Sequence, residues 1–180
     1  MLRLSTIELF KEEIKFSAGH FTIFSSTVRE NLHGHNYNLY VAFTTQIEDE
    51  GLSFDYRFYK EKLYTLCQRL DETVILPGNS KHLSITKHGN YYHANFNSEV
   101  MIFLERDVKI LPINNVTVEE LSNWFLQQII TDEQELKQNK ICAINVKVFS
   151  GPGQSGSSAW EKNTATLVHK KTDPLEYAHV

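Results

Sequence analysis

Two histidines one residue apart, His33 and His35, are the side chains of this sequence best placed to do chemistry. They stand at the start of an apolar segment with the pattern of a β-strand, in which side chains at positions i and i+2 leave the same face. A third histidine, His20, ends residues 14–20, which also have a strand pattern. If the two strands pair, the three imidazoles meet. Three histidines with an open fourth position describe a catalytic zinc site rather than a structural one.

The zinc hypothesis depends on His20. A His-x-His pair alone is weak evidence, because histidine also serves as an acid, a base and a proton shuttle. Three other histidines are separated by polar residues without ligand spacing, and we expect them on the surface: His82, His88 and His93.

The composition narrows the class of protein. A chain of 180 residues, 41% hydrophobic and 12% aromatic, is long and apolar enough to bury the core of one globular domain. The net charge of -4 argues against nucleic-acid and anionic-membrane partners, which usually require a basic surplus. Two cysteines suit a reducing compartment. With no apolar run of about 18 residues and no signal-peptide pattern, we expect a cytoplasmic protein.

Four strands and two helices are expected to position the histidines. Apolar and polar residues alternate loosely in residues 6–16, 36–46, 141–149 and 159–170, which predicts strands there. One helix follows Asp55, a candidate N-cap, and carries an apolar stripe at helical spacing: Tyr59, Leu63, Leu66, Cys67 and Leu70. A second helix begins after Thr117.

The expected order of elements indicates an α+β fold. Strands and helices do not alternate, so the two helices would lie together on one face of an antiparallel four-stranded sheet. Residues 77–113 form an insert with two short strand candidates, 91–96 and 100–104, which would make a hairpin or an arm that packs on another subunit. Residues 1–180 are expected to form a single domain around this sheet.

Several motifs occur here in the order found in one protein family. They are Phe16-Ser17-Ala18-Gly19-His20, His33-Gly34-His35-Asn36-Tyr37, Leu70-Asp71 and Thr117-Val118-Glu119-Glu120-Leu121. The chain resembles, over about residues 8–165, the 6-pyruvoyltetrahydropterin synthase family, which includes the bacterial 6-carboxytetrahydropterin synthase of queuosine biosynthesis.

The resemblance implies a fold, a cofactor, a substrate and an assembly. These are the tunnelling fold, Zn²⁺ on His20, His33 and His35, the pterin 7,8-dihydroneopterin triphosphate, and a homohexamer of two stacked trimers. The implied activity is that of a carbon–oxygen lyase acting on the pterin side chain. Thr117 and Glu120 are the implied substrate-binding residues, although their spacing is also that of a helix capping box.

Three catalytic positions of the family are not matched. No cysteine lies in the loop before His33, where Thr27 and Arg29 occupy the usual spacings. The family's Leu-Asp-His motif is Leu70-Asp71-Glu72 in this chain, and Ser150 stands where a glutamate anchors the pterin ring. A cysteine-based mechanism is therefore not expected, whereas Ser150 is kept as a substrate-binding candidate.

Glu30 is the candidate replacement for the cysteine. The spacing Glu30-x-x-His33-Gly34-His35 resembles the type III branch of the family, in which a glutamate takes the place of the cysteine and the product is 6-hydroxymethyl-7,8-dihydropterin for folate. A carboxylate beside Zn²⁺ could act as a general base, the alternative being an exposed loop acid. Asp71 and Glu72 are further acid–base candidates, with Glu72 alternatively a carboxylate at a helix end.

Three functions remain open at this point. They are a synthase of the pyruvoyl or carboxy type, a type III synthase, and a non-catalytic pterin-binding relative that retains the metal.

Overall fold

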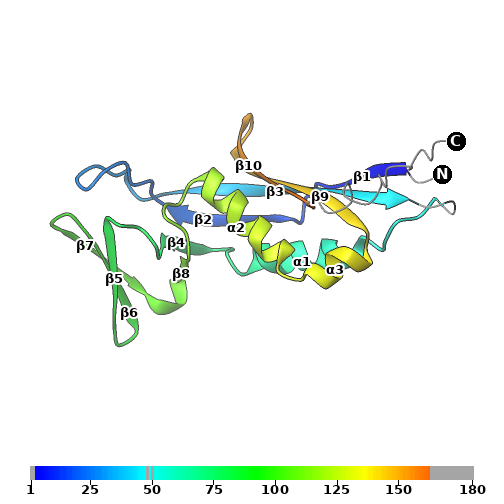
Figure 1. Cartoon of the computed structure of the whole chain (residues 1–180). Helices are drawn as coiled ribbons and strands as arrows, with labels where there is room; N and C mark the ends of the chain where they lie inside the picture. The colour runs from blue at the N-terminus through cyan, green and yellow to red at the C-terminus, as the bar shows by residue number, and fades with distance from the viewer. Residues whose placement is uncertain (1–2, 48, 50, 163–180) are drawn as a thin grey trace, which may run out of the picture.

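The computed structural model describes residues 3–47, 49 and 51–162. Its main element is a seven-stranded sheet in the order β10-β9-β3-β2-β4-β8, with β1 also paired to β3 (Figure 1). The strands are β1 (Arg3–Leu9), β2 (Lys15–His20), β3 (His33–Ile47), β4 (Thr73–Pro77), β8 (Val108–Leu111), β9 (Ile141–Gly151) and β10 (Gln154–Glu161).

The sheet is organised around β3, a strand of 15 residues. β2 pairs with the first part of β3, from His20 opposite His33 to Lys15 opposite Asn38. β1 continues along the same edge from Leu9 opposite Val41. The strand predicted for residues 6–16 is therefore two strands, separated by a charged turn in which the amide of Ile14 donates to the carbonyl of Lys11 (3.0 Å).

The sheet is larger than expected and is not wholly antiparallel. β2 pairs in parallel with β4, and β4 pairs in parallel with β8. β4 has only five residues and β8 only four, which are too few for a clear alternation of polar and apolar positions. The last strand begins earlier than predicted, at Gln154, and residues 163–170 of the prediction lie outside the described residues.

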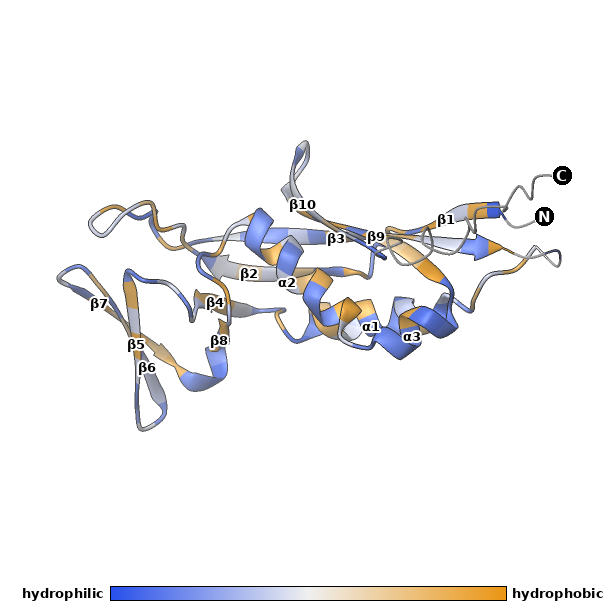
Figure 2. Ribbon diagram, viewed as in Figure 1, coloured by the Kyte–Doolittle hydropathy of each residue, from blue (hydrophilic) through white to orange (hydrophobic). Residues whose placement is uncertain are grey.

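Three helices lie together on one side of the main sheet, α1 (Arg57–Gln68), α2 (Val118–Ile130) and α3 (Glu133–Gln138) (Figures 1 and 2). The α+β prediction is thereby confirmed, with α3 as an addition. The N-cap of α1 is Tyr56, and Asp55 lies just outside it, where its Oδ1 accepts from the amide of Arg57 (3.0 Å). No helix in the described part of the chain is long and apolar enough to cross a membrane.

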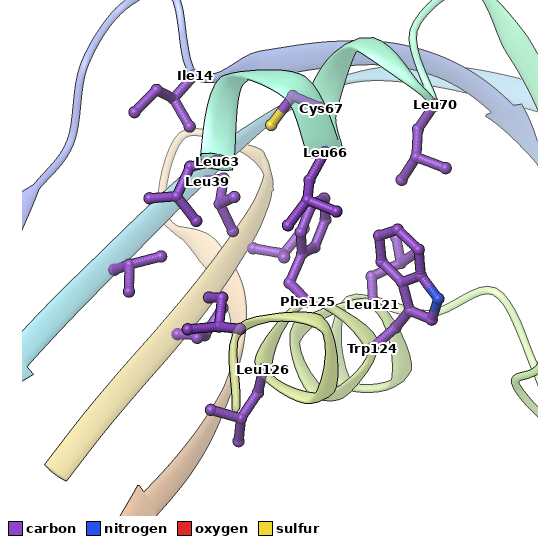
Figure 3. Packing of buried hydrophobic residues seen from close by; sticks show 14 of the residues in the cluster. Ile14, Leu39, Leu63, Leu66, Cys67, Leu70, Leu121, Trp124, Phe125 and Leu126 are labelled. Carbon is purple, nitrogen blue, oxygen red and sulfur yellow. The ribbon is translucent and has the colours of Figure 1, made fainter. Parts of the chain in front are cut away.

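The main core lies between the helices and the sheet. Figure 3 shows Leu63 and Leu66 of α1 and Phe125 of α2 among its buried side chains. Each fully buried side chain of this size contributes roughly 1.5–3 kcal/mol to folding. Phe16 of β2 also packs here, stacked on Tyr37 of β3 at 4.9 Å between ring centroids. This stacking joins the core to the strands that carry the histidines.

The insert is a three-stranded antiparallel sheet, β5 (Leu83–His88), β6 (Tyr91–Phe96) and β7 (Glu99–Leu104). The predicted hairpin is β6 with β7, and β5 extends it. A second hydrophobic cluster joins this sheet to the loop between β2 and β3, which lies at the same end of the molecule (Figure 1). Its buried members are Phe21, Ile23, Leu76, Leu83, Ala94, Phe96 and Val108.

The two cysteines are predicted to differ in reactivity. Cys67 is fully buried in the main core, and burial raises the pKa of its thiol to about 12, whereas Cys142 is half-buried. Because the thiolate is the reactive form, native protein treated with iodoacetamide at pH 8 should be labelled at Cys142 and spared at Cys67. Peptide mass spectrometry, with urea-unfolded protein as the control, measures this. Equal labelling of both thiols in the native protein would contradict the packing described.

Candidate metal centre

The pairing of β2 with β3 brings the three histidines together. His20 lies directly opposite His33, and His35 follows two residues along β3 on the same face. The ring centroids are 4.5 Å apart for His20 and His33, 5.2 Å for His20 and His35, and 4.9 Å for His33 and His35. One nitrogen from each ring lies within 4.8 Å of the other two, the one such group of potential metal ligands found among the described residues.

Backbone carbonyls orient two of the rings. Nδ1 of His20 donates to the carbonyl of Val116 (2.9 Å), and Nδ1 of His33 donates to that of Asn31 (2.9 Å). Each ring therefore has its lone pair on Nε2, which is how metal-binding histidines are usually held. Nε2 of His20 is buried without a hydrogen-bond partner in the described part of the chain. This orphaned atom fits a metal ligand.

The separation of the other two nitrogens also fits a metal. Nε2 of His33 and Nε2 of His35 are 3.1 Å apart. Tetrahedral ligands about 2.0–2.1 Å from Zn²⁺ would be about 3.3 Å apart. Three imidazoles are a donor set that zinc accepts, and they leave one position open. The residues present therefore fit a zinc ion.

The surroundings of His20 keep it neutral. Burial lowers the pKa of His20, and the nearby His33 and His35 lower it further, against the opposing effect of the hydrogen bond to Val116. A neutral imidazole is the form that binds metal.

Glu30 lies beside the histidines on the loop between β2 and β3. Its Oε2 accepts from the amide of Thr22 (2.9 Å), and its own amide donates to the carbonyl of Thr22 (2.9 Å). Burial by itself raises the pKa of Glu30, but the hydrogen bonds from Thr22 and the nearby imidazoles of His33 and His20 outweigh it, so that the pKa is lowered. Glu30 is thus a carboxylate at neutral pH.

A small pocket of about 180 Å³ opens over these groups. Its lining includes the three histidines, Glu30 and two of the predicted substrate-binding residues, Thr117 and Ser150. Tyr37, buried beneath His20 and His35, forms part of its wall, and burial raises the pKa of this phenol so that it stays protonated.

The first turn of α2 presents Glu119 to the pocket rather than Glu120. The carboxylate of Glu120 accepts instead from the amide of Asn114 (3.1 Å). Thr117 is the N-cap and its Oγ1 accepts from the amide of Glu120 (3.3 Å), which is one half of the predicted capping box. Sequence reasoning also missed Gln154, because its approach to the pocket depends on how β10 turns back after β9.

Asp71 and Glu72 lie outside the pocket that holds Glu30. Oδ1 of Asp71 accepts from the amide of Ser17 (2.7 Å), an interaction that ties the end of α1 to β2. Glu72, with a positive φ of 56°, lines a second pocket of about 420 Å³ that also borders His35. Within one chain the structure thus brings Glu30, and neither of these two residues, to the three-histidine pocket.

Asn115 connects the loop that carries Glu30 to the start of α2. Its Oδ1 accepts from the amide of Ile23 (3.0 Å) and its Nδ2 donates to the carbonyl of Ile23 (2.8 Å). The same Oδ1 accepts from the amide of Val116 (3.0 Å), whose carbonyl orients His20. One side chain therefore aligns the loop and a metal-ligand candidate.

A mixed sheet covered by helices on one side, with three converging histidines beside a glutamate, defines a tunnelling-fold protein of the pterin synthase class. The family model described as 6-pyruvoyl tetrahydropterin synthase matches residues 9–159, and the chain belongs to this family. A relative from Methanocaldococcus jannaschii, provisionally named 6-carboxy-5,6,7,8-tetrahydropterin synthase, is 29% identical over 143 residues, which are 78% of this chain and 86% of the relative.

Solved structures of proteins named as members of this family are also similar to this chain. The 6-pyruvoyl tetrahydropterin synthase of Plasmodium vivax is 28% identical, with a TM-score of 0.84 over 89% of this chain and 99% of that one. The Plasmodium falciparum protein is 29% identical, with a TM-score of 0.83 over 88% of this chain and 99% of that one. Two further Plasmodium vivax structures are variants in which a glutamate, named a catalytic residue, is replaced by alanine or cysteine.

The first turn of α2 is held in place by close contact with β10, which gives a testable prediction. A Cβ added at Gly156 would lie 2.5 Å from the carbonyl carbon of Val118, so Gly156→Ala must displace the turn that carries Thr117 and Glu119. We expect a loss of about 1–3 kcal/mol in the free energy of unfolding, measured by urea titration. The matched control is Gly151→Ala, where nothing lies within 4 Å of the added atom. Equal stability of the two variants would refute the close approach.

Proposed function

We propose that this protein is a zinc-dependent pterin lyase that acts on 7,8-dihydroneopterin triphosphate and uses Glu30 as its proton acceptor. The observation that carries the proposal is the convergence of His20, His33 and His35, with the buried Nε2 of His20 left without a partner among the described residues. Membership of the family supports the pterin substrate class.

His20, His33 and His35 would hold the zinc ion. When bound, zinc supplies a Lewis acid that polarises a hydroxyl of the substrate side chain. The carbonyls of Val116 and Asn31 keep two of the ligand rings in the required orientation. Tyr37 excludes water from beneath the ligands, because it is buried against both Phe16 and His35.

Glu30 would take a proton from the substrate carbon next to the polarised hydroxyl. Its lowered pKa means that the side chain is ionised at neutral pH, which is the form that can accept a proton. The amide of Thr22 holds one oxygen in place. A glutamate is also named as a catalytic residue of the Plasmodium vivax protein, as expected if a carboxylate can replace the family's thiol.

Thr117, Glu119 and Ser150 would bind the pterin ring, because they line the pocket beside the histidines. We propose Glu119 in place of Glu120, whose carboxylate is engaged by Asn114. The carboxylate of Glu119 can accept hydrogen bonds from ring N–H groups. It would thereby take the role of the family's ring-anchoring glutamate, whose position is occupied by Ser150 in this chain.

The size of the pocket supports an assembly of several chains. A volume of about 180 Å³ is small for a pterin triphosphate, since ligand sites usually enclose roughly 300–1,000 Å³. We propose that neighbouring subunits complete the site, in the hexamer of two trimers expected from the family. A catalytic role for Asp71 or Glu72 would require such an assembly.

Glu30 also favours a second candidate reaction, the formation of 6-hydroxymethyl-7,8-dihydropterin. Incubating the purified protein with 7,8-dihydroneopterin triphosphate and identifying the pterin products by mass spectrometry decides between the candidates. Release of triphosphate with a pyruvoyl or carboxy product supports the first reaction, and a hydroxymethyl product supports the second. Pterin binding without turnover would contradict both and indicate a binding protein.

Zinc content provides the next prediction. The purified protein should contain about one zinc ion per chain, and His20→Ala should lose most of it because one of three protein ligands is removed. Inductively coupled plasma mass spectrometry measures the stoichiometry. His88→Ala, which removes an exposed histidine of the insert, should retain the metal. Full zinc content in the His20 variant would overturn the proposed ligand set.

The role of Glu30 predicts a loss of rate without a loss of metal. Glu30→Gln keeps the shape of the side chain but cannot accept the proton, so kcat should fall by about 10²–10⁴-fold. Zinc content should stay unchanged, and the exposed-carboxylate variant Glu12→Gln should have normal kcat. An active Glu30→Gln protein would show that another group is the base.

A further inference from the structure

Arg29 connects the loop that carries Glu30 to the insert. One terminal nitrogen of its guanidinium donates to the carbonyl of Glu30 (2.8 Å), and the other donates to Oε2 of Glu99 (2.6 Å). The Arg29 side chain is only 17% exposed. A planar guanidinium can make these two bonds in fixed directions at once, which the single ammonium of a lysine cannot.

Two aromatic rings, one from the loop and one from the insert, pack against the guanidinium of Arg29. Its central carbon lies 5.2 Å from the ring centre of Phe21, which begins the loop, and 5.7 Å from that of Phe96, which ends β6. Both rings belong to the buried cluster between the loop and the insert. Nε of Arg29 is buried without a partner in the part of the chain that the structure describes.

Further hydrogen bonds within the loop connect the backbone of Arg29 to the side chain of Glu30. Ile23 and Arg29 form a β-bridge, and Thr22 bonds both the amide and the carboxylate of Glu30. Arg29 does not line the pocket over the histidines, although it stands at a spacing where the family carries its cysteine. Its contacts are with the insert instead.

We propose that Arg29 is a positioning residue, and that the insert, through Glu99, fixes the carboxylate of Glu30 against the three histidines. The insert is then part of the catalytic apparatus, although it contributes no side chain to the pocket. The inference rests on the proposed function, because it assigns a task to the loop that carries the proton acceptor. Thr117, Glu119 and Ser150 lie on elements other than the loop, so substrate binding should not depend on this connection.

The test uses the full chain with Glu99→Gln, which removes the charge of the partner of Arg29 at a side chain that is 62% exposed. We expect kcat to fall by about tenfold or more, because small displacements of a catalytic group are costly. KM and zinc content should not change. Glu99→Asp, which keeps the charge, should retain an intermediate kcat. The matched control is Glu105→Gln, which breaks the exposed ion pair of Lys87 with Glu105 on the same insert and should leave kcat normal.

Hydrogen exchange gives a readout that does not require activity. The amides of Thr22 and Glu30 should exchange about tenfold faster in Glu99→Gln than in Glu105→Gln, because the loop opens more often. Faster exchange together with a lower kcat and an unchanged KM supports the proposal. Unchanged exchange, or faster exchange with normal kcat, overturns it. If the unsubstituted protein turns over no pterin, the proposed function fails, and the exchange of these two amides alone decides whether the insert positions Glu30.

Discussion

The site depends on the register between β2 and β3. A shift of one residue would turn His20 to the opposite face of the sheet and separate it from His33 and His35. The register is held by burial, since Phe16 and Tyr37 stack on each other in the core and cannot exchange places with their polar neighbours. The same pairing that buries two aromatic rings therefore brings three imidazoles together.

The start of α2 completes the site whose histidines lie on β2 and β3. The turn before α2 supplies the carbonyl that orients His20, and Asn115 joins this turn to the loop that carries Glu30. The close approach of Gly156 to Val118 keeps the first turn of α2 beside the histidines. Groups from four separate segments thus meet in one small pocket, and none of those segments could form the site alone.

Local patterns predicted much of this arrangement. The histidine spacing, the apolar stripe of α1, the Thr117 cap and the hairpin of the insert all follow from residues close together in the sequence. Features set by distant contacts were missed. The parallel pairing of β4 depends on where the chain returns after the insert, and the choice between Glu119 and Glu120 depends on how α2 is rotated. Asp71 could not be assigned either, since its partner Ser17 lies 54 positions away.

We propose above all that three imidazoles bind one zinc ion and leave a position open for substrate. X-ray absorption spectroscopy at the zinc edge of the purified protein tests this most directly. We expect three imidazole nitrogens at about 2.0–2.1 Å and one further light ligand that is exchanged when pterin is added. A shell closed by four protein ligands, or a spectrum that pterin does not change, would contradict it.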